Sequence, residues 1–201
     1  MKNNTIRIIF GFFLSTILAS CQYKTTQNNI TPTSDITWKL NPEYSTLSII
    51  TTKNNSIAEV SEFTDFTGQI SPDGSLLITL NMNSLETNIP IRNERIQQHL
   101  FQTDIYDTAE IRAILKPKDL NIGVHTITFD VDLHGVSAIL EAEFMVFEQF
   151  ENKIVTLHKP LIINAKTFGL ENGITTLKNL ASLDTIDLSV PVNLILSFQP
   201  E

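Results

Sequence analysis

Apolar and polar residues alternate with a period of two along much of the chain between residues 76 and 196. The apolar positions form four such runs, at 76–82, 127–133, 138–146 and 188–196. Alternation over these lengths is typical of antiparallel strands with one buried face and one solvated face. Pro191 falls inside the last run and indicates an edge or irregular position there, because proline cannot donate to a strand ladder. The pattern therefore predicts an all-β domain.

Short segments rich in glycine and polar residues separate the runs. Each is predicted to be a turn: 71–74, 121–123, 134–135 and 171–173. Many antiparallel strands joined by tight turns favour a sandwich or a closed barrel.

One segment, residues 90–101, breaks the strand pattern because it is polar, rich in helix formers and free of glycine. It predicts a short helix with Asn88 as its cap and Pro90 in its first turn. Arg92, Arg95 and His99 are spaced at i, i+3 and i+7, so a helix would align them on one side. They could form a polar lip for a ligand headgroup, or an ordinary solvated helix face with Arg95 paired to an acid.

The first 21 residues have the organisation of an export signal. Lys2 and Arg7 precede an apolar run at 8–18, which is too short to span a bilayer. The run ends in LASC at 18–21, which resembles a lipobox, and Cys21 is the only cysteine in the chain. Lipidation would cap a thiol that has no internal disulfide partner. We expect Cys21 to become the lipid-bearing N-terminus; the alternative is a plain signal or uncleaved anchor with an incidental cysteine.

Residues 22–37 are polar and aperiodic, which predicts a flexible tether.

The net charge of the mature chain excludes some classes of binding partner. Removal of residues 1–20 leaves 14 − 2 = 12 basic against 22 acidic residues, a formal net charge of −10. Such a surface repels nucleic acid and anionic headgroups, so membrane attachment must come from the lipid anchor. We expect a monomer in the bacterial envelope that faces the periplasm, and Gln22 favours the outer membrane over the inner one.

Catalytic signatures are missing from the sequence. It contains no metalloprotease, serine-hydrolase or phosphate-loop motif, and its four histidines are not spaced as metal ligands. His134, two residues after Asp132, could serve as a ligand or an acid–base group, but a turn histidine bonded to backbone before Gly135 is favoured. We therefore expect no enzymatic activity, no metal site and no cofactor other than a bound lipid.

Six segments in order resemble the YceI-like family of exported lipid-binding proteins. They are WKLNPEYS (38–45), FTDFTGQI (63–70), SLET (84–87), RIQQHLF (95–101), DLHGVS (132–137) and NAKTFGL (164–170). The resemblance covers residues 38 to about 198. The sequence departs from the family at several positions: Ile96 and Ala165 stand where the family has arginine, Thr167 replaces aspartate, and Asp107 replaces proline.

The resemblance implies a lipocalin-like antiparallel eight-stranded β-barrel with a short capping helix. It also implies a long apolar tunnel for a polyisoprenoid chain, either an isoprenoid quinone or a prenyl pyrophosphate. The chain is thereby divided into a lipoprotein signal (1–20), a lipidated cysteine with its tether (21–37) and a YceI-like barrel domain (38–201).

Strand register predicts which side chains would line that tunnel. Burial of an unpaired carboxylate costs several kcal/mol, so the acids at 130, 132, 141 and 143 must face water. Their neighbours then face the lumen: Phe129, Val131, Leu133, Leu140, Ala142 and Phe144. The small Ala142 would leave room for a chain, so Ala142→Phe is expected to block the tunnel.

Three functions remain open from the sequence. The first is a non-enzymatic carrier or sequestering protein for an isoprenoid-type lipid. The second is an envelope scaffold, stress or interaction lipoprotein with a packed barrel and no stable ligand. The third is an enzyme or redox accessory acting on quinones, which would need clustered polar residues inside the tunnel. A continuous apolar cavity favours the first function, and a filled core favours the second.

Overall fold

The computed structural model describes residues 36–201. The expected signal, Cys21 and all but the last two residues of the expected tether lie outside the described residues. The strands are β1 Trp38–Leu40, β2 Thr46–Lys53, β3 Ile57–Phe63, β4 Phe66–Ile70, β5 Ser75–Asn81, β6 Leu85–Glu86, β7 Thr108–Ile114, β8 Gly123–Leu133, β9 Val136–Gln149, β10 Asn152–Leu157, β11 Leu161–Asn164 and β12 Ser189–Pro200. The helices are α1 Pro90–Arg95 and α2 Glu171–Leu180.

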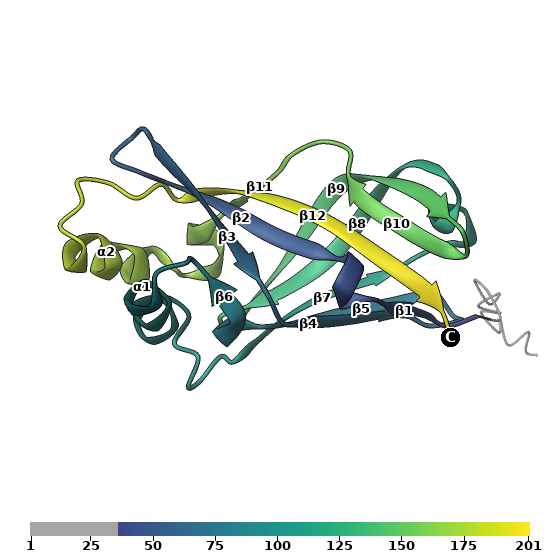
Figure 1. Ribbon diagram of the computed structural model, residues 1–201, viewed down its shortest axis with the longest axis horizontal. Coiled ribbons are helices and arrows are strands. Elements are labelled where there is room, and N and C mark those ends of the chain that lie inside the picture. Colours follow the sequence, from purple (N-terminus) through teal and green to yellow (C-terminus); the bar gives the residue numbers. More distant parts are fainter. Residues whose placement is uncertain (1–35) are drawn as a thin grey trace, which may run out of the picture. The chain divides into compact units, whose positions relative to one another are not determined.

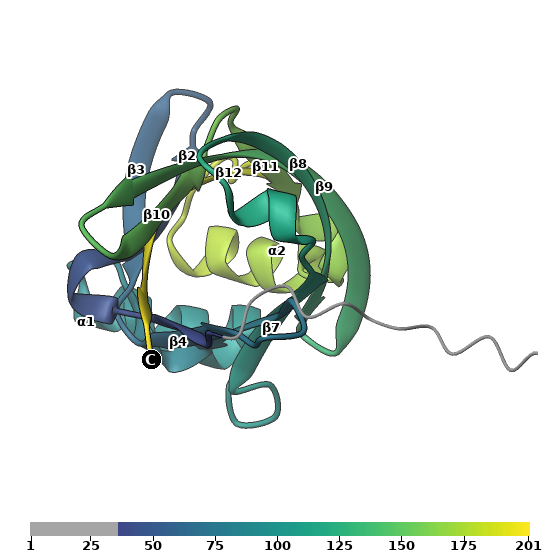
Figure 2. The same ribbon diagram turned by 90° about the vertical axis from the view of Figure 1, so that its right-hand side faces the viewer.

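Eight of these strands close into an antiparallel barrel, as predicted. The order around the ring is β1-β4-β5-β7-β8-β9-β10-β12, and β1 closes it by pairing with both β4 and β12. Trp38, for example, lies opposite Ile70 on one side and Pro200 on the other. Figure 2 shows the closed ring, with α2 visible through it.

The other end of the barrel is built differently. Beyond its pairing with β1 and β10, β12 continues alongside β2 and β11, and β2 pairs with β3. Helices α1 and α2 lie at this end, and the C-terminus lies at the opposite end (Figure 1). We call them the helical end and the terminal end.

The predicted helix at 90–101 is present, but its geometry changes along its length. It is α-helical to Arg95 and continues as a π-helix, Ile96–Phe101. Asn88 does not cap it: the cap position is Ile89, which makes no side-chain cap bond, and Asn88 has φ 60°. Instead, Asn93 Oδ1 accepts hydrogen bonds from Thr87 N at 3.0 Å and Thr87 Oγ1 at 2.6 Å. A residue in the middle of α1, Asn93, thus holds the segment that leads into the helix.

The prediction of a turn at 171–173 is wrong, because these residues form the first turn of α2. Gly173 lies against the π-helix: a Cβ built on it would be 2.6 Å from the His99 carbonyl oxygen. Glycine is therefore required here for the close approach of two helical segments and does not mark a turn. No helix among residues 36–201 has both the length and the apolar character needed to cross a bilayer.

The strand faces follow the predicted alternation. Phe129 and Val131 are buried, whereas Asp130 and Glu141 are exposed. Pro191 pairs with Ile162 of β11 on one side, and the ladder with β2 begins only at Val192. Its missing N–H therefore falls at an irregular position, as predicted.

Candidate functional site

An elongated cavity of about 540 Å³ lies inside the barrel. Its middle is apolar and draws side chains from many strands around the ring. Representative lining residues are Leu47, Phe63, Ile78, Ile111, Phe129, Val131, Val155, Leu194 and Leu196. This size and apolar character are typical of sites for small apolar ligands.

The cavity opens at the helical end. Among the described residues that line it, those that are exposed all belong to this end: Ile89, Ile91, Ala181 and Asp187. Ile91 is in α1, Ile89 directly precedes it, and the other two follow α2. We call this opening the mouth.

Charged side chains gather at the mouth and link its elements. The Glu59 carboxylate of β3 lies 2.8 Å from Lys53 Nζ of β2. It also accepts two hydrogen bonds from Arg92 of α1, at 3.0 and 3.3 Å. The hydrogen bond from Lys53 and the charge of Arg92 lower the pKa of Glu59 from its ordinary value, against an opposing effect of burial. The β2–β3 hairpin is thus bridged to α1 by an ionised carboxylate.

Arg95 also lines the cavity but has a different partner. Its Nη1 donates to the carbonyl oxygen of Leu180, at the end of α2, over 3.4 Å. The acid pairing considered for Arg95 is made by Arg92 instead. Of the two arginines, Arg95 therefore has the guanidinium that is not engaged with a carboxylate.

The terminal end of the cavity has fewer polar lining residues than the helical end, and none of the residues that line it there is exposed. Its polar lining residues are Asp119, His125 and Lys153. His125 Nε2 lies 2.8 Å from the Asn121 carbonyl oxygen. Lys153 Nζ is 2.9 Å from Glu148 Oε1 and 4.8 Å from the centre of the Trp38 ring. Since the side chain of Lys153 is only 13% exposed, it covers this end of the cavity.

The predicted tunnel residues divide into two groups. Phe129, Val131, Leu133 and Phe144 line the cavity. Leu140 and Ala142 lie on the inward face of β9 and pack against the core, but they do not line the cavity. Phe129, directly opposite Leu140, packs edge to face with Phe144 at 6.0 Å between ring centres. Ala142 carries only a methyl group, and Ile127, directly opposite it on β8, lines the cavity instead.

The predicted polar lip is also divided. Arg92 and Arg95 line the mouth, but His99 is exposed and does not. The prediction assumed α-helical spacing through residue 99. The change to a π-helix at Ile96 adds residues to each turn, so His99 rotates away from the face that carries the arginines.

Several residues at the two ends were not predicted: Lys53, Glu59, Asp119, His125, Lys153 and Asp187. They come from separate segments that only the closed barrel brings together. Of these residues, Glu59 could have been found from the sequence. It lies four residues before the apolar Phe63 on the same strand, so both side chains point to the inward face. A charge on an inward position is a sign of a functional or paired site.

The two family arginine positions are apolar in this chain and both face the ligand space. Ile96 and Ala165 are buried and line the cavity. Among residues 36–201, the cations that line the cavity at the helical end are therefore Lys53, Arg92 and Arg95. Among residues 36–201, no group of three His, Cys, Asp or Glu side chains could hold a metal ion.

His134 has a structural role in the β8–β9 turn. It has φ 55°, followed by Gly135 with φ 71°. Its Nε2 lies 3.3 Å from the side-chain oxygen of Gln102, and its ring is 4.6 Å from that of Tyr106. It is a turn residue, as favoured, but its partner is a side chain and not the backbone.

Comparison with known proteins identifies similar chains. A family model for the YceI-like domain matches residues 38–198. A polyisoprenoid-binding domain from Saccharophagus degradans, implicated in plant cell wall breakdown, is 30% identical, with a TM-score of 0.78 over 82% of this chain and 98% of that one. A search of curated proteins found no match.

Two more distant structures share the fold. BcnA from Burkholderia cenocepacia is 14% identical, with a TM-score of 0.65 over 79% of this chain and 98% of that one. A YceI protein from Campylobacter jejuni is also 14% identical, with a TM-score of 0.52 over 70% of this chain and 84% of that one.

Proposed function

The chain belongs to the YceI-like family, and from this premise we propose that it binds an isoprenoid-type lipid as a non-enzymatic carrier or sequestering protein. The observation that carries the proposal is the apolar cavity along the barrel, open at one end through a charged mouth. A chain-shaped lipid with a polar head matches this shape and polarity. The polyisoprenoid-binding relative from Saccharophagus degradans supports the same ligand class.

Energetics favour a long apolar chain. Burial of each methylene of a ligand is worth about 0.8 kcal/mol. The middle of the cavity offers apolar side chains and few polar groups, so affinity comes from the length of the buried chain. The alternative from the sequence, an envelope scaffold or interaction protein with no stable ligand, requires a barrel interior filled by side chains. A cavity of about 540 Å³ argues against that alternative.

The mouth favours an uncharged headgroup over a pyrophosphate. Glu59 already neutralises part of the charge of Lys53 and Arg92, and Asp187 adds a second carboxylate. Apolar residues at positions 96 and 165 leave no further cation in the wall there. Arg95 can donate hydrogen bonds to a carbonyl oxygen, which suits an isoprenoid quinone.

The proposed setting is the bacterial envelope. A lipid on Cys21 would hold the barrel at a membrane, facing the periplasm, through the tether at 22–37. The protein would act there as a monomer, and the outer membrane is favoured over the inner one. No catalytic group is assigned, because the polar residues of the cavity lie at its two ends and not around its middle.

The deciding experiment narrows the cavity. Ala109 of β7 is buried and lines the cavity, so Ala109→Phe places a phenyl group in the ligand space. Protein is purified from its native host, or from a bacterial host that makes quinones, and extracted lipid is identified and quantified by mass spectrometry. We expect the wild type to carry an isoprenoid lipid and Ala109→Phe to carry several-fold less.

Ala58→Phe is the matched control. Ala58 is an exposed position of β3 that does not line the cavity, so the same added ring should leave the bound lipid unchanged. Both variants should retain a cooperative thermal transition. Wild-type protein without lipid, or full occupancy in a folded Ala109→Phe variant, would rule out the carrier function.

A further inference from the structure

We infer that the Lys153 side chain closes the terminal end of the cavity and limits the length of the lipid chain that the barrel holds. This inference rests on the proposed function and specifies which isoprenoid lipids fit. Lys153 lines the large cavity and also a second hollow of about 410 Å³. The other residues that line the second hollow are Ile36, Trp38, Glu148, Phe150, Glu151 and Pro200. The Lys153 side chain therefore lies between the two spaces.

Strand register directs Lys153 into the barrel. Val155, two residues later on β10, lines the cavity, and residues two apart in a strand share a face. On the neighbouring strands, Lys153 lies opposite Glu148 of β9 and Phe198 of β12. Phe198 is buried and also lines the cavity. The inward row of β10 thus changes from an apolar side chain to a cation at the terminal end.

Two side chains hold the Lys153 ammonium group in place. Its Nζ atom is 2.9 Å from Glu148 Oε1 and 4.8 Å from the centre of the Trp38 ring. Trp38 lies opposite Ile70, which is buried and lines the cavity, so the two side chains share the inward face. The hydrocarbon stem of Lys153 can therefore cover the end of the cavity while its ammonium group reaches polar partners.

A hydrocarbon tail cannot displace this ammonium group at low cost. To pass Lys153, the tail would have to separate the cation from its carboxylate and its aromatic ring, and would leave the cation against apolar atoms. The wall beyond is also less favourable to the tail, because Glu148 and Glu151 line the second hollow. Affinity should therefore rise with chain length only until the tail reaches Lys153.

The other polar residues at this end are bonded to nearby backbone. His125 Nε2 lies 2.8 Å from the Asn121 carbonyl oxygen, and Asp119 Oδ2 accepts a hydrogen bond from the Lys116 amide at 2.8 Å. These contacts fix both side chains within their own segment of the chain. Lys153, in contrast, is held by side chains and separates the two hollows, so its substitution is the change that should join them.

The test measures affinity against chain length. Full-length wild type, Lys153→Ala and Lys153→Met are titrated with isoprenoid quinones that differ only in the number of isoprene units. Each affinity is obtained from displacement of a fluorescent isoprenoid analogue. In the wild type, each methylene that becomes buried should raise the affinity about fourfold, and the affinity should reach a plateau when the tail meets Lys153.

Lys153→Ala should move the plateau to a longer quinone, because the tail can then enter the second hollow. For the first quinone beyond the wild-type plateau, the variant should bind on the order of tenfold or more tightly than the wild type. Short quinones should bind both proteins equally, because their tails do not reach this end. Glu148, which loses its partner, is 48% exposed and stays hydrated, so the variant should retain a cooperative thermal transition.

Lys153→Met is the second variant, and it decides the question if Lys153→Ala does not fold. Methionine keeps a side chain of similar length and so preserves the packing of the barrel end. Its flexible, uncharged chain has no ion pair to break, so a tail can displace it. The plateau should again move to a longer quinone.

Lys159→Ala is the matched control. Lys159 also pairs with a carboxylate, that of Glu143, but its side chain is 67% exposed and does not line the cavity. This variant loses the same atoms and the same charge as Lys153→Ala. Its plateau should coincide with that of the wild type.

Two results would overturn the inference while leaving the proposed function intact. One is a plateau at the same quinone in the wild type and in both folded Lys153 variants. The other is a wild-type affinity that rises through the whole series without a plateau. A wild type that binds no quinone of any length would overturn the quinone assignment of the proposed function and this inference with it.

Discussion

At the scale of single residues, Gly173 determines how closely the two helical segments at the mouth can pack. A Cβ at this position would lie 2.6 Å from the His99 carbonyl oxygen and 2.8 Å from Leu100 Cα. Both are backbone atoms, which cannot rotate away as the end of a long side chain can. The sequence identified glycine correctly as a special position but assigned it to a turn.

Gly173→Ala is therefore expected to destabilise the protein although alanine is the better helix former. Alanine gains about 1 kcal/mol in helix propensity, whereas overpacking against backbone costs about 1–3 kcal/mol. The net loss should lower the thermal midpoint. Asn172→Ala, at an exposed position of the same turn of α2, should not lower it. An increase in the midpoint for Gly173→Ala would mean that the segments can separate freely.

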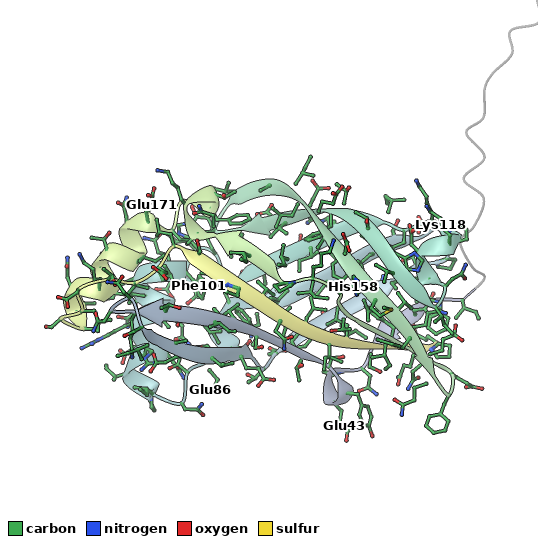
Figure 3. The ribbon with its side chains drawn as sticks, turned by 90° about the horizontal axis from the view of Figure 1, so that it is seen from above. Glu43, Glu86, Phe101, Lys118, His158 and Glu171 are labelled. Carbon is green, nitrogen blue, oxygen red and sulfur yellow. The ribbon has the colours of Figure 1, made fainter. Side chains whose placement is uncertain are left out.

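At the scale of elements, the contact between the β2–β3 hairpin and α1 controls the mouth. Glu59 joins Lys53 and Arg92 across it, and all three residues line the cavity. Figure 3 labels Glu86, Phe101 and Glu171 at this end of the molecule, where helices and the strands β2, β3, β6 and β11 extend beyond the closed ring. A ligand can enter without opening the barrel if these elements move apart.

Glu59→Gln should accelerate exchange of bound lipid without changing the amount bound. Partly exposed ion pairs contribute up to about 1 kcal/mol, so the dissociation rate should rise by about fivefold at most. The rate is measured by transfer of a fluorescent isoprenoid analogue to empty vesicles. Glu62→Gln, on the solvent-facing side of the same strand, removes an equal charge and should leave the rate unchanged.

Lower pH should reproduce this effect in the wild type. The pKa of Glu59 is depressed below its ordinary value of 4.5, so its contribution is complete above that pH and is lost as the pH falls through the lower folded value. Exchange in the wild type should therefore accelerate below about pH 4.5, and exchange in Glu59→Gln should not respond there. A parallel acceleration in both proteins would assign the pH effect to another group.

At the scale of the whole molecule, the barrel and the expected anchor together define where a bound lipid could be delivered. Cys21→Ala should abolish incorporation of a labelled fatty acid and release the protein from membranes or leave an unprocessed precursor. Residues beyond the N-terminal segment should fold as before, because the ring of eight strands closes without it. Label that remains on the Cys21→Ala protein would place the modification elsewhere.

The sequence alone determined the helix at 90–101 and four of the strands with their faces. Alternation of apolar and acidic residues at 127–133 and 138–146 placed Phe129 and Val131 inward, because a carboxylate cannot be buried unpaired. Local turn chemistry at His134-Gly135 and the proline at 191 were equally readable. The order of the six motifs then identified the family, and the family identified a closed barrel.

Only the tertiary structure decided the site. Lys53, Glu59 and Arg92 meet because the hairpin and α1 converge on one end of the barrel, and no local pattern encodes that convergence. From ideal helix and strand periods, His99 was assigned to the polar lip and Ala142 to the lumen. A π-helix turned His99 outward, and Ile127, opposite Ala142, lines the cavity in place of the short alanine side chain. Periodicity fixes which face of an element a residue occupies, but the side chains of neighbouring elements decide whether it reaches the cavity.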